Sequence, residues 1–403
     1  MLELDDVLAA EPRVRETSRH TPIEYTHTFS DMTGAEVHLK MENFQRTGSF
    51  KIRGATNRIA TLSEEEKAAG VVTASAGNHA QGVALAATRS GVDSKIVMPE
   101  YAPISKVKAT QSYGAEVVLH GADYDEAAEK AHELEREEGR TYVHAFDDEK
   151  VMAGQGTIAL EILEDLPEVE TVLVPIGGGG LISGISTAIK AKSPDTRVIG
   201  VQAEGASSVA QSLSKGHRVE LDHVDTIADG IAVRGPGTLT YEVIKERVDE
   251  VVTVSDPEIA MALTYVLERG KTLVEGAGAA PLAALLFDKF DYEEDEIIVP
   301  AMCGGNIDLN MLTTAIMRGL VATGRYVKIK TVLRDRPGSL EDLLHIISEK
   351  KANIYAIQHD RTSRQIGMAD TEVEVDLETR GRDHIDELLE AIRDAGYEVE
   401  VLV

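Results

Sequence analysis

The stretch TVLVPIGGGGL, residues 171–181, carries the most specific signal in this sequence. A mostly apolar run is followed by four consecutive glycines and then by a helical pattern that begins at Leu181. A short apolar run that ends at glycines is typical of a buried strand. Because glycine has no Cβ, successive N–H groups can converge on an anion, and the N-terminus of the next helix adds partial positive charge. The stretch therefore predicts a phosphate-binding loop between a strand and a helix.

This pattern differs from two common nucleotide-binding motifs. It has neither the spaced glycines of the dinucleotide motif nor the Gly-Lys-Ser/Thr sequence of the triphosphate loop. The alternative is a tight, closely packed turn, which would need only one or two glycines.

Apolar runs alternate with helical patterns on both sides of this stretch. Ser63 and Glu66 fit a capping box at a helix start, and Ala80–Arg89 is predicted to be a helix of small residues. The alternation predicts an α/β fold with mostly parallel sheets covered by helices. The predicted strands are Gly70–Ala74, Lys95–Met98, Glu116–Leu119, Thr171–Ile176, Val198–Gln202 and Ile297–Ala301.

The pattern changes near Tyr326. From there the order is strand, helix, strand, strand, helix, strand, which is a complete βαββαβ unit. We therefore expect two domains, residues 1–322 and 327–403, joined at Thr323–Arg325, with a small subdomain at about 68–150 inside the first. The predicted elements of the unit are Val327–Leu333, Pro337–Lys350, Ile354–His359, Thr371–Leu377, Arg382–Ala395 and Glu398–Val403.

The composition excludes several classes of function. The chain has 403 residues, with 41 Lys and Arg against 69 Asp and Glu, and a formal net charge of -28. This charge disfavours nucleic acid and anionic lipid as partners, and no apolar run approaches the roughly 18 residues of a spanning helix. The chain start lacks the pattern of a secretory signal, and its single cysteine, Cys303, permits no intrachain disulfide. We expect a cytoplasmic protein without nucleic-acid or membrane partners.

The acidic residues are spread along the chain and not gathered in one tail. Dispersed acidic residues are typical of solvated faces. We interpret them as adaptation to a salt-rich cytosol, where ionic strength screens self-repulsion, with a merely acidic protein as the alternative.

Three further motifs carry side chains suited to chemistry. Lys51 lies in GSFKIRG, residues 48–54, where burial would lower its pKa and free an amine for Schiff-base formation, unless it is a surface lysine. The motif SAGNHAQG, residues 75–82, opens a helix after a strand, which makes a second anion site or simply a helix capped by Ser75 or Asn78. Cys303, in CGGN, follows another strand and so lies at the ligand-binding edge of the sheet, unless it only packs.

An amine, two anion-binding loops and a polar group at strand ends are what a pyridoxal phosphate site requires. Together with KMENFQ at residues 40–45, these motifs resemble the threonine/serine dehydratase family of fold-type-II pyridoxal phosphate enzymes. The resemblance implies a fold similar to the tryptophan synthase β subunit, with two open twisted sheets and helices. The C-terminal unit, with DRPGSL at residues 335–340, resembles the ferredoxin-like ACT regulatory domain.

The resemblance implies a role for each matching residue. Lys51 would be bonded to the cofactor aldehyde and would remove the substrate α-proton, and Asn78 would hydrogen-bond the 3′ oxygen of the cofactor. Cys303 would face the pyridine nitrogen, where several relatives have serine. Ser75 is a candidate acid for the leaving hydroxyl, beside the cofactor phosphate. The phosphate would be held by Gly177, Gly178, Gly179, Gly180 and Leu181, and the substrate carboxylate by Ser75, Gly77, Asn78 and His79.

The implied activity is deamination of L-threonine to 2-oxobutanoate and ammonia by elimination of water, with L-serine giving pyruvate, as the first step of isoleucine biosynthesis. One alternative is a serine dehydratase or a serine racemase, in which Ser75 would be the second base. Another is a non-catalytic amino-acid sensor, although a sensor has no use for a Schiff-base lysine.

The C-terminal unit carries expectations of its own. The resemblance implies pairing in a homodimer or homotetramer and binding of isoleucine or valine near Gly338 and Asn353, with a purely structural dimerisation domain as the alternative. Glu275, Asp225 and Asp229 lie in segments where some relatives bind a cation. We name no metal ligand, because charged loop residues are usually only solvated.

Overall fold

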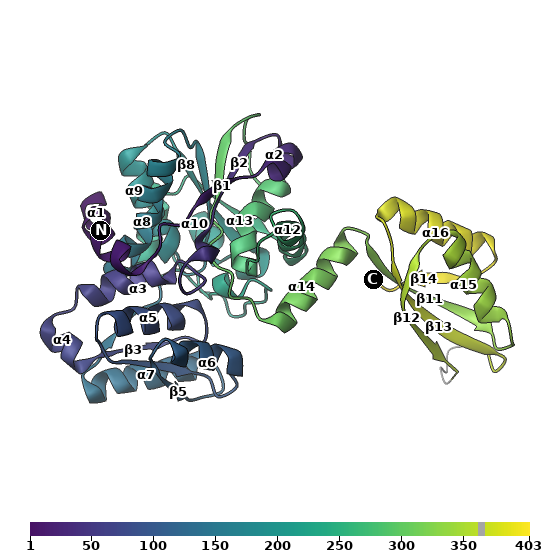
Figure 1. Cartoon of the computed structure of the whole chain (residues 1–403), viewed down its shortest axis with the longest axis horizontal. Helices are drawn as coiled ribbons and strands as arrows, with labels where there is room; N and C mark the ends of the chain where they lie inside the picture. Colours follow the sequence, from purple (N-terminus) through teal and green to yellow (C-terminus); the bar gives the residue numbers. More distant parts are fainter. Residues whose placement is uncertain (362–366) are drawn as a thin grey trace. The chain divides into compact units, whose positions relative to one another are not determined.

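The computed structural model describes residues 1–361 and 367–403 (Figure 1). The chain divides into two compact units, Met1–Met311 and Leu312–Val403. The first unit contains two sheets and the second contains one, and each unit has its own hydrophobic core.

The first unit contains a large sheet with the strand order β1-β2-β10-β7-β8-β9. Only β1 runs antiparallel to its neighbour, and the other pairs are parallel. Every residue of β7 is buried, in keeping with its uninterrupted apolar sequence. The strands are β1 (Ile23–Tyr25), β2 (Glu36–Lys40), β7 (Thr171–Pro175), β8 (Arg197–Ala203), β9 (Glu250–Val254) and β10 (Ile297–Pro300).

A second, wholly parallel sheet has the order β5-β4-β3-β6. In Figure 1 its strands and the helices α4 to α7 form a lobe beside the large sheet. Small residues of α5 pack on β3 and β4, which allows a close approach of helix to sheet. The strands are β3 (Val71–Ala74), β4 (Ser94–Met98), β5 (Glu116–Leu119) and β6 (Thr141–Tyr142).

Most helices of the first unit lie along the chain between strands of the parallel sheets, where crossover connections are required. Helices α9 and α13 both contact β7 and β8, so the strand that leads into the glycines lies in the middle of the core. The predicted capping box at Ser63 is confirmed at the start of α4. The helices are α1 (Leu4–Thr17), α2 (His27–Thr33), α3 (Lys51–Ala60), α4 (Glu64–Ala69), α5 (Asn78–Arg89), α6 (Ile104–Ser112), α7 (Tyr124–Glu138), α8 (Glu149–Asp165), α9 (Gly180–Lys192), α10 (Ser208–Lys215), α11 (Thr238–Arg247), α12 (Asp256–Glu268) and α13 (Gly276–Leu286). A further helix, α14 (Leu309–Ala322), begins in the first unit, but its residues 312–322 belong to the second.

The fold predicted from the sequence is confirmed, including all six strands named for this unit. Four strands were not predicted: β1, β2, β6 and β9. Of these, β1 has three residues and β6 two, and both β2 and β9 begin with glutamate, which weakens the apolar signal.

The second unit is the predicted βαββαβ arrangement, with one antiparallel sheet of order β12-β13-β11-β14. Alternate residues of β11 and β13 are buried against α15 and α16. The predicted turn and helix over Pro337–Lys350 are confirmed: Gly338 adopts a left-handed conformation with φ of 94°, and the helix begins at Ser339. The elements are β11 (Tyr326–Arg334), α15 (Ser339–Glu349), β12 (Asn353–Asp360), β13 (Asp370–Glu378), α16 (Arg382–Asp394) and β14 (Val399–Val401).

Candidate active site

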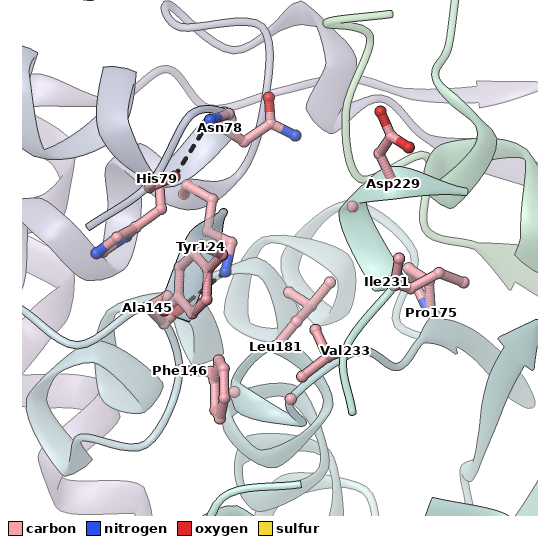
Figure 2. A pocket seen from close by; sticks show the side chains of 18 of the residues that line it. Asn78, His79, Tyr124, Ala145, Phe146, Pro175, Leu181, Asp229, Ile231 and Val233 are labelled. Carbon is pink, nitrogen blue, oxygen red and sulfur yellow. Dashed lines mark hydrogen bonds between the residues drawn. The ribbon is translucent and has the colours of Figure 1, made fainter. Parts of the chain in front are cut away.

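A cavity of about 800 Å³ lies in the first unit, between the ends of strands from both sheets. Figure 2 shows Asn78 and His79, at the start of α5, on one side of it and Asp229, Ile231 and Val233 on the other. All the residues predicted for cofactor and substrate in this unit line the cavity: Lys51, Ser75, Gly77, Asn78, His79, Gly177, Gly178, Gly179, Gly180, Leu181 and Cys303. Parallel strands deliver their following loops to one edge of a sheet, which explains why motifs far apart in the sequence meet here.

Lys51 is the first residue of α3, and its Nζ lies in the cavity wall. The loop before it is pinned to the segment after β10, since Phe50 N donates to Cys303 O at 3.1 Å and Gly305 N donates to Gly48 O at 2.9 Å. Nζ donates to Ala145 O at 2.8 Å. Burial lowers the pKa of Lys51 to about 8. The amine is therefore far easier to deprotonate than that of a surface lysine.

The glycine loop packs tightly. A Cβ on Gly178 would lie 2.4 Å from the ring of Phe146, a Cβ on Gly180 would lie 2.8 Å from Phe146 Cα, and Gly179 has a φ of 96°. Close packing therefore requires more glycines than the one or two expected of a tight turn, and the run of glycines alone does not prove phosphate binding.

The backbone donors of the loop are the stronger signal. Within residues 1–361 and 367–403, no group accepts a hydrogen bond from the N–H of Gly178, Gly179, Gly180 or Leu181. These N–H groups stand at the N-terminus of α9, where the helix dipole adds partial positive charge. The loop thus offers several unpaired donors to an anion in the cavity.

The start of α5 is a second set of donors. Its N-cap is Gly77, not Ser75 or Asn78, but Ser75 Oγ accepts from Gly77 N at 3.2 Å and from Ala80 N at 3.3 Å. The N–H groups of Asn78 and His79 have no acceptor among the described residues. The helix start therefore remains able to bind a carboxylate.

The ring of His79 is directed to the backbone and not to a ligand. Its Nε2 lies 2.9 Å from Val143 O, and burial lowers its pKa to about 3. The neutral ring donates to the carbonyl of Val143, directly after β6, and so holds that segment against α5. What His79 offers the cavity is therefore its backbone N–H.

Cys303 and Glu275 are both buried at the cavity wall. Burial raises the pKa of the Cys303 thiol well above its usual value, so the side chain is a neutral partner. Burial also raises the pKa of Glu275 to about 7. Glu275 Oε1 accepts from Asn78 Nδ2 at 2.7 Å, an arrangement that the sequence did not predict.

Other cavity residues were also not predicted. Phe146 and Asp147 follow β6, and Asp147 accepts hydrogen bonds from the first N–H groups of α11 at Thr238, Leu239 and Thr240. No local motif in the sequence marks this segment. Its position depends on contacts between residues more than ninety positions apart.

Two ion pairs join the lobe of the small sheet to the segment 229–234 at the cavity. Lys106 Nζ lies 3.9 Å from Asp229 Oδ2, and Arg234 Nη1 lies 3.6 Å from Asp125 Oδ2.

In the part of the chain that the structure describes, no group of three acidic, histidine or cysteine side chains could hold a metal ion. The same residues include no helix with the length and apolar character needed to cross a bilayer.

Comparison with known proteins identifies the family. Residues 14–304 match the pyridoxal-phosphate dependent enzymes, and the chain belongs to that family. Residues 323–397 match the ACT domain, so the enzyme carries an ACT domain at its C-terminal end. Both resemblances drawn from the sequence are confirmed, and the cofactor is pyridoxal phosphate.

Individual relatives agree. The chain is 48% identical over 402 residues to the L-threonine ammonia-lyase of Thermotoga maritima, with 100% of both chains covered. It is 42% identical to the solved threonine deaminase isoform 2 of Solanum lycopersicum, with a TM-score of 0.76 over 78% of this chain and 92% of the other. Maize serine racemase is 37% identical, with a TM-score of 0.74 over 79% of this chain and 98% of the other.

The residues of the cavity fit the cofactor. The N–H groups at the start of α9 are unpaired donors suited to a phosphate, and the amine of Lys51 is suited to an aldehyde. Cys303 adds a neutral side chain to the cavity wall. Two helix N-termini facing one cavity suit a ligand with two anionic groups.

Proposed function

We propose that this enzyme deaminates L-threonine to 2-oxobutanoate and ammonia. The observation that carries the proposal is the amine of Lys51 in one cavity with two sets of unpaired backbone donors. The Thermotoga maritima relative, alike over its whole length and named L-threonine ammonia-lyase, supports the choice of substrate. The net reaction needs no oxidant, since the substrate loses its α-proton and β-hydroxyl as water and regains water when the C–N bond is hydrolysed.

Bound pyridoxal phosphate would supply an aldehyde that takes an amino group and a conjugated ring that accepts electron density from the substrate α carbon. In our proposal, Gly177, Gly178, Gly179, Gly180 and Leu181 bind its phosphate, Asn78 its 3′ oxygen, and Cys303 faces its ring nitrogen.

Lys51 is the base that removes the α-proton in this proposal. A pKa of about 8 leaves a useful fraction of the amine neutral near neutral pH, and the neutral amine is the form that accepts a proton. The hydrogen bond from Nζ to Ala145 O, at 2.8 Å, holds the amine in one position in the cavity.

The substrate carboxylate is assigned to the start of α5, at Ser75, Gly77, Asn78 and His79. The unpaired N–H groups of Asn78 and His79 support that assignment. Ser75 Oγ accepts two backbone hydrogen bonds, which leaves its own proton available to the leaving hydroxyl, beside the cofactor phosphate.

Turnover tests the proposal. Keto acids formed from L-threonine and from L-serine are measured in concentrated KCl, and D-serine is recorded in the same samples. Faster 2-oxobutanoate than pyruvate formation supports a threonine ammonia-lyase. D-serine without much keto acid would instead make the protein a serine racemase, and a Lys51→Ala variant with normal turnover would refute the assignment of the base.

We further propose that the enzyme is cytoplasmic and halophilic, that it assembles as a homodimer or homotetramer, and that isoleucine or valine regulates it in isoleucine biosynthesis. The effector site is assigned near Gly338 and Asn353. Gly338 is the N-cap of α15 and has open space around it, whereas Asn353 Nδ2 already donates to Glu378 Oε2 at 2.8 Å. If isoleucine changes neither turnover nor threonine cooperativity, the regulatory part of the proposal fails.

A further inference from the structure

The side-chain amide of Asn78 lies between two side chains that are distant from it in the sequence, Glu275 and Asn306. Its Nδ2 donates to Glu275 Oε1 at 2.7 Å, and its Oδ1 accepts from Asn306 Nδ2 at 2.8 Å. An amide nitrogen carries two hydrogens, so one N–H of Asn78 is left for a ligand in the cavity that Asn78 lines.

Asn306 can occupy only one orientation. Besides bonding Asn78, its Nδ2 donates to Thr47 O at 2.6 Å, which uses both of its hydrogens. A flipped Asn306 would present its oxygen to two other oxygens. Gly48 leaves room for this amide, since a Cβ there would lie 2.4 Å from Asn306 Oδ1. Asn306 is therefore a fixed donor.

Glu275 is the fixed acceptor on the other side. Its own N donates to Gly304 O at 2.9 Å just before α13, and a Cβ on Gly304 would lie 2.5 Å from its Oε1. Glu275 has no ion-pair partner within 4.0 Å in the described part of the chain. Even with its pKa raised to about 7 by burial, a carboxyl keeps an acceptor oxygen in either protonation state.

A donor on one side and an acceptor on the other select one of the two flips of an amide. We propose that Glu275 and Asn306 are positioning residues that hold the Asn78 amide so that its remaining N–H points to the ring oxygen of bound pyridoxal phosphate. This inference rests on the proposed cofactor site and assigns no contact between Glu275 and the substrate.

The test is a cofactor titration of the full chain. The chain is stripped of cofactor and titrated with pyridoxal phosphate, with the dissociation constant and the ratio of the visible absorption bands recorded. Asn78→Ala removes a charge-assisted hydrogen bond and weakens binding roughly tenfold to hundredfold. Glu275→Leu weakens it about fivefold and changes the band ratio in the same direction, because the amide loses its acceptor.

Glu275→Gln is the matched control. Glutamine keeps an acceptor oxygen at the same place, so affinity and band ratio stay within about twofold of the starting protein. If Glu275→Gln weakens cofactor affinity as much as Glu275→Leu does, the charge of Glu275 is what matters and not its role as an acceptor. That result would refute the inference.

A double-mutant cycle decides whether Glu275 acts through Asn78. In the Asn78→Ala background, Glu275→Leu should have no further effect on cofactor affinity. A full additional loss there would refute the inference while leaving the proposed function intact. Asn306→Ala provides an independent version of the same cycle if Glu275→Leu fails to fold. A starting protein that takes up no pyridoxal phosphate would overturn the proposed function and this inference together.

Discussion

Replacing Arg53 should destabilise the first unit more than any surface ion pair does. Arg53 lies on α3, two residues after Lys51, and is fully buried. Its guanidinium donates to both carboxylate oxygens of Glu42 at 2.8 and 2.7 Å and to both of Glu161 at 2.7 and 2.7 Å. Lys40 Nζ is the other cation of the cluster, 2.7 Å from Glu161. Arg53→Met would leave two buried carboxylates with one cation between them.

The magnitude follows from that geometry. Removing one partner of a buried ion pair costs about 3–5 kcal/mol. At about 2–4 °C of Tm per kcal/mol, the expected fall in Tm of the first unit is roughly 6–20 °C. The control is Arg15→Met on α1, where Arg15 Nη2 lies 3.0 Å from Glu164 Oε2 and the two side chains are 53% and 58% exposed. A pair open to solvent is worth at most about 1 kcal/mol, so this Tm should fall by less than about 4 °C.

Calorimetry on the full chain measures both variants, with the transition of the second unit as an internal reference because it contains neither arginine. The pairing holds the pKa of Glu161 below its usual value of 4.5, so its contribution to stability is present above that pH and is lost as the pH falls. The difference between Arg53→Met and the starting protein should therefore shrink toward acid pH. Equal falls in Tm for the two variants would refute the reasoning.

Three shorter predictions concern the cavity and the charge. Gly178→Ala places a Cβ 2.4 Å from the Phe146 ring, so we expect overpacking of about 1–3 kcal/mol and weaker uptake of pyridoxal phosphate, and unchanged affinity in a fluorescence titration would contradict this. The rate of cofactor uptake by the stripped chain should rise with pH around a midpoint near 8, since only the neutral Lys51 amine attacks an aldehyde, whereas a midpoint near 10.5 would mean an ordinary lysine. The thermal unfolding midpoint should rise with added KCl, because salt screens the repulsion of a chain of net charge -28, and a flat or falling midpoint would argue against halophilic adaptation.

The fold class and one part of the cavity lining could be predicted from local patterns in the chain. Alternating apolar runs and helical patterns fix parallel sheets, and parallel strands bring their following loops to one edge, so Lys51, the motif at 75–82, the glycines at 177–180 and Cys303 could be expected together. These features are local in the chain, and a local pattern is what a sequence displays directly.

The surroundings of these residues depend on how the whole chain folds. The acceptor for Lys51 is Ala145 O, the partners of the Asn78 amide are Glu275 and Asn306, and the ring against the glycines belongs to Phe146. Each of these contacts joins segments that lie far apart along the chain. The local sequence of one segment does not indicate which distant residue it will contact. Burial acts in the same way, because the pKa of Lys51 or Glu275 depends on how much water the folded chain excludes.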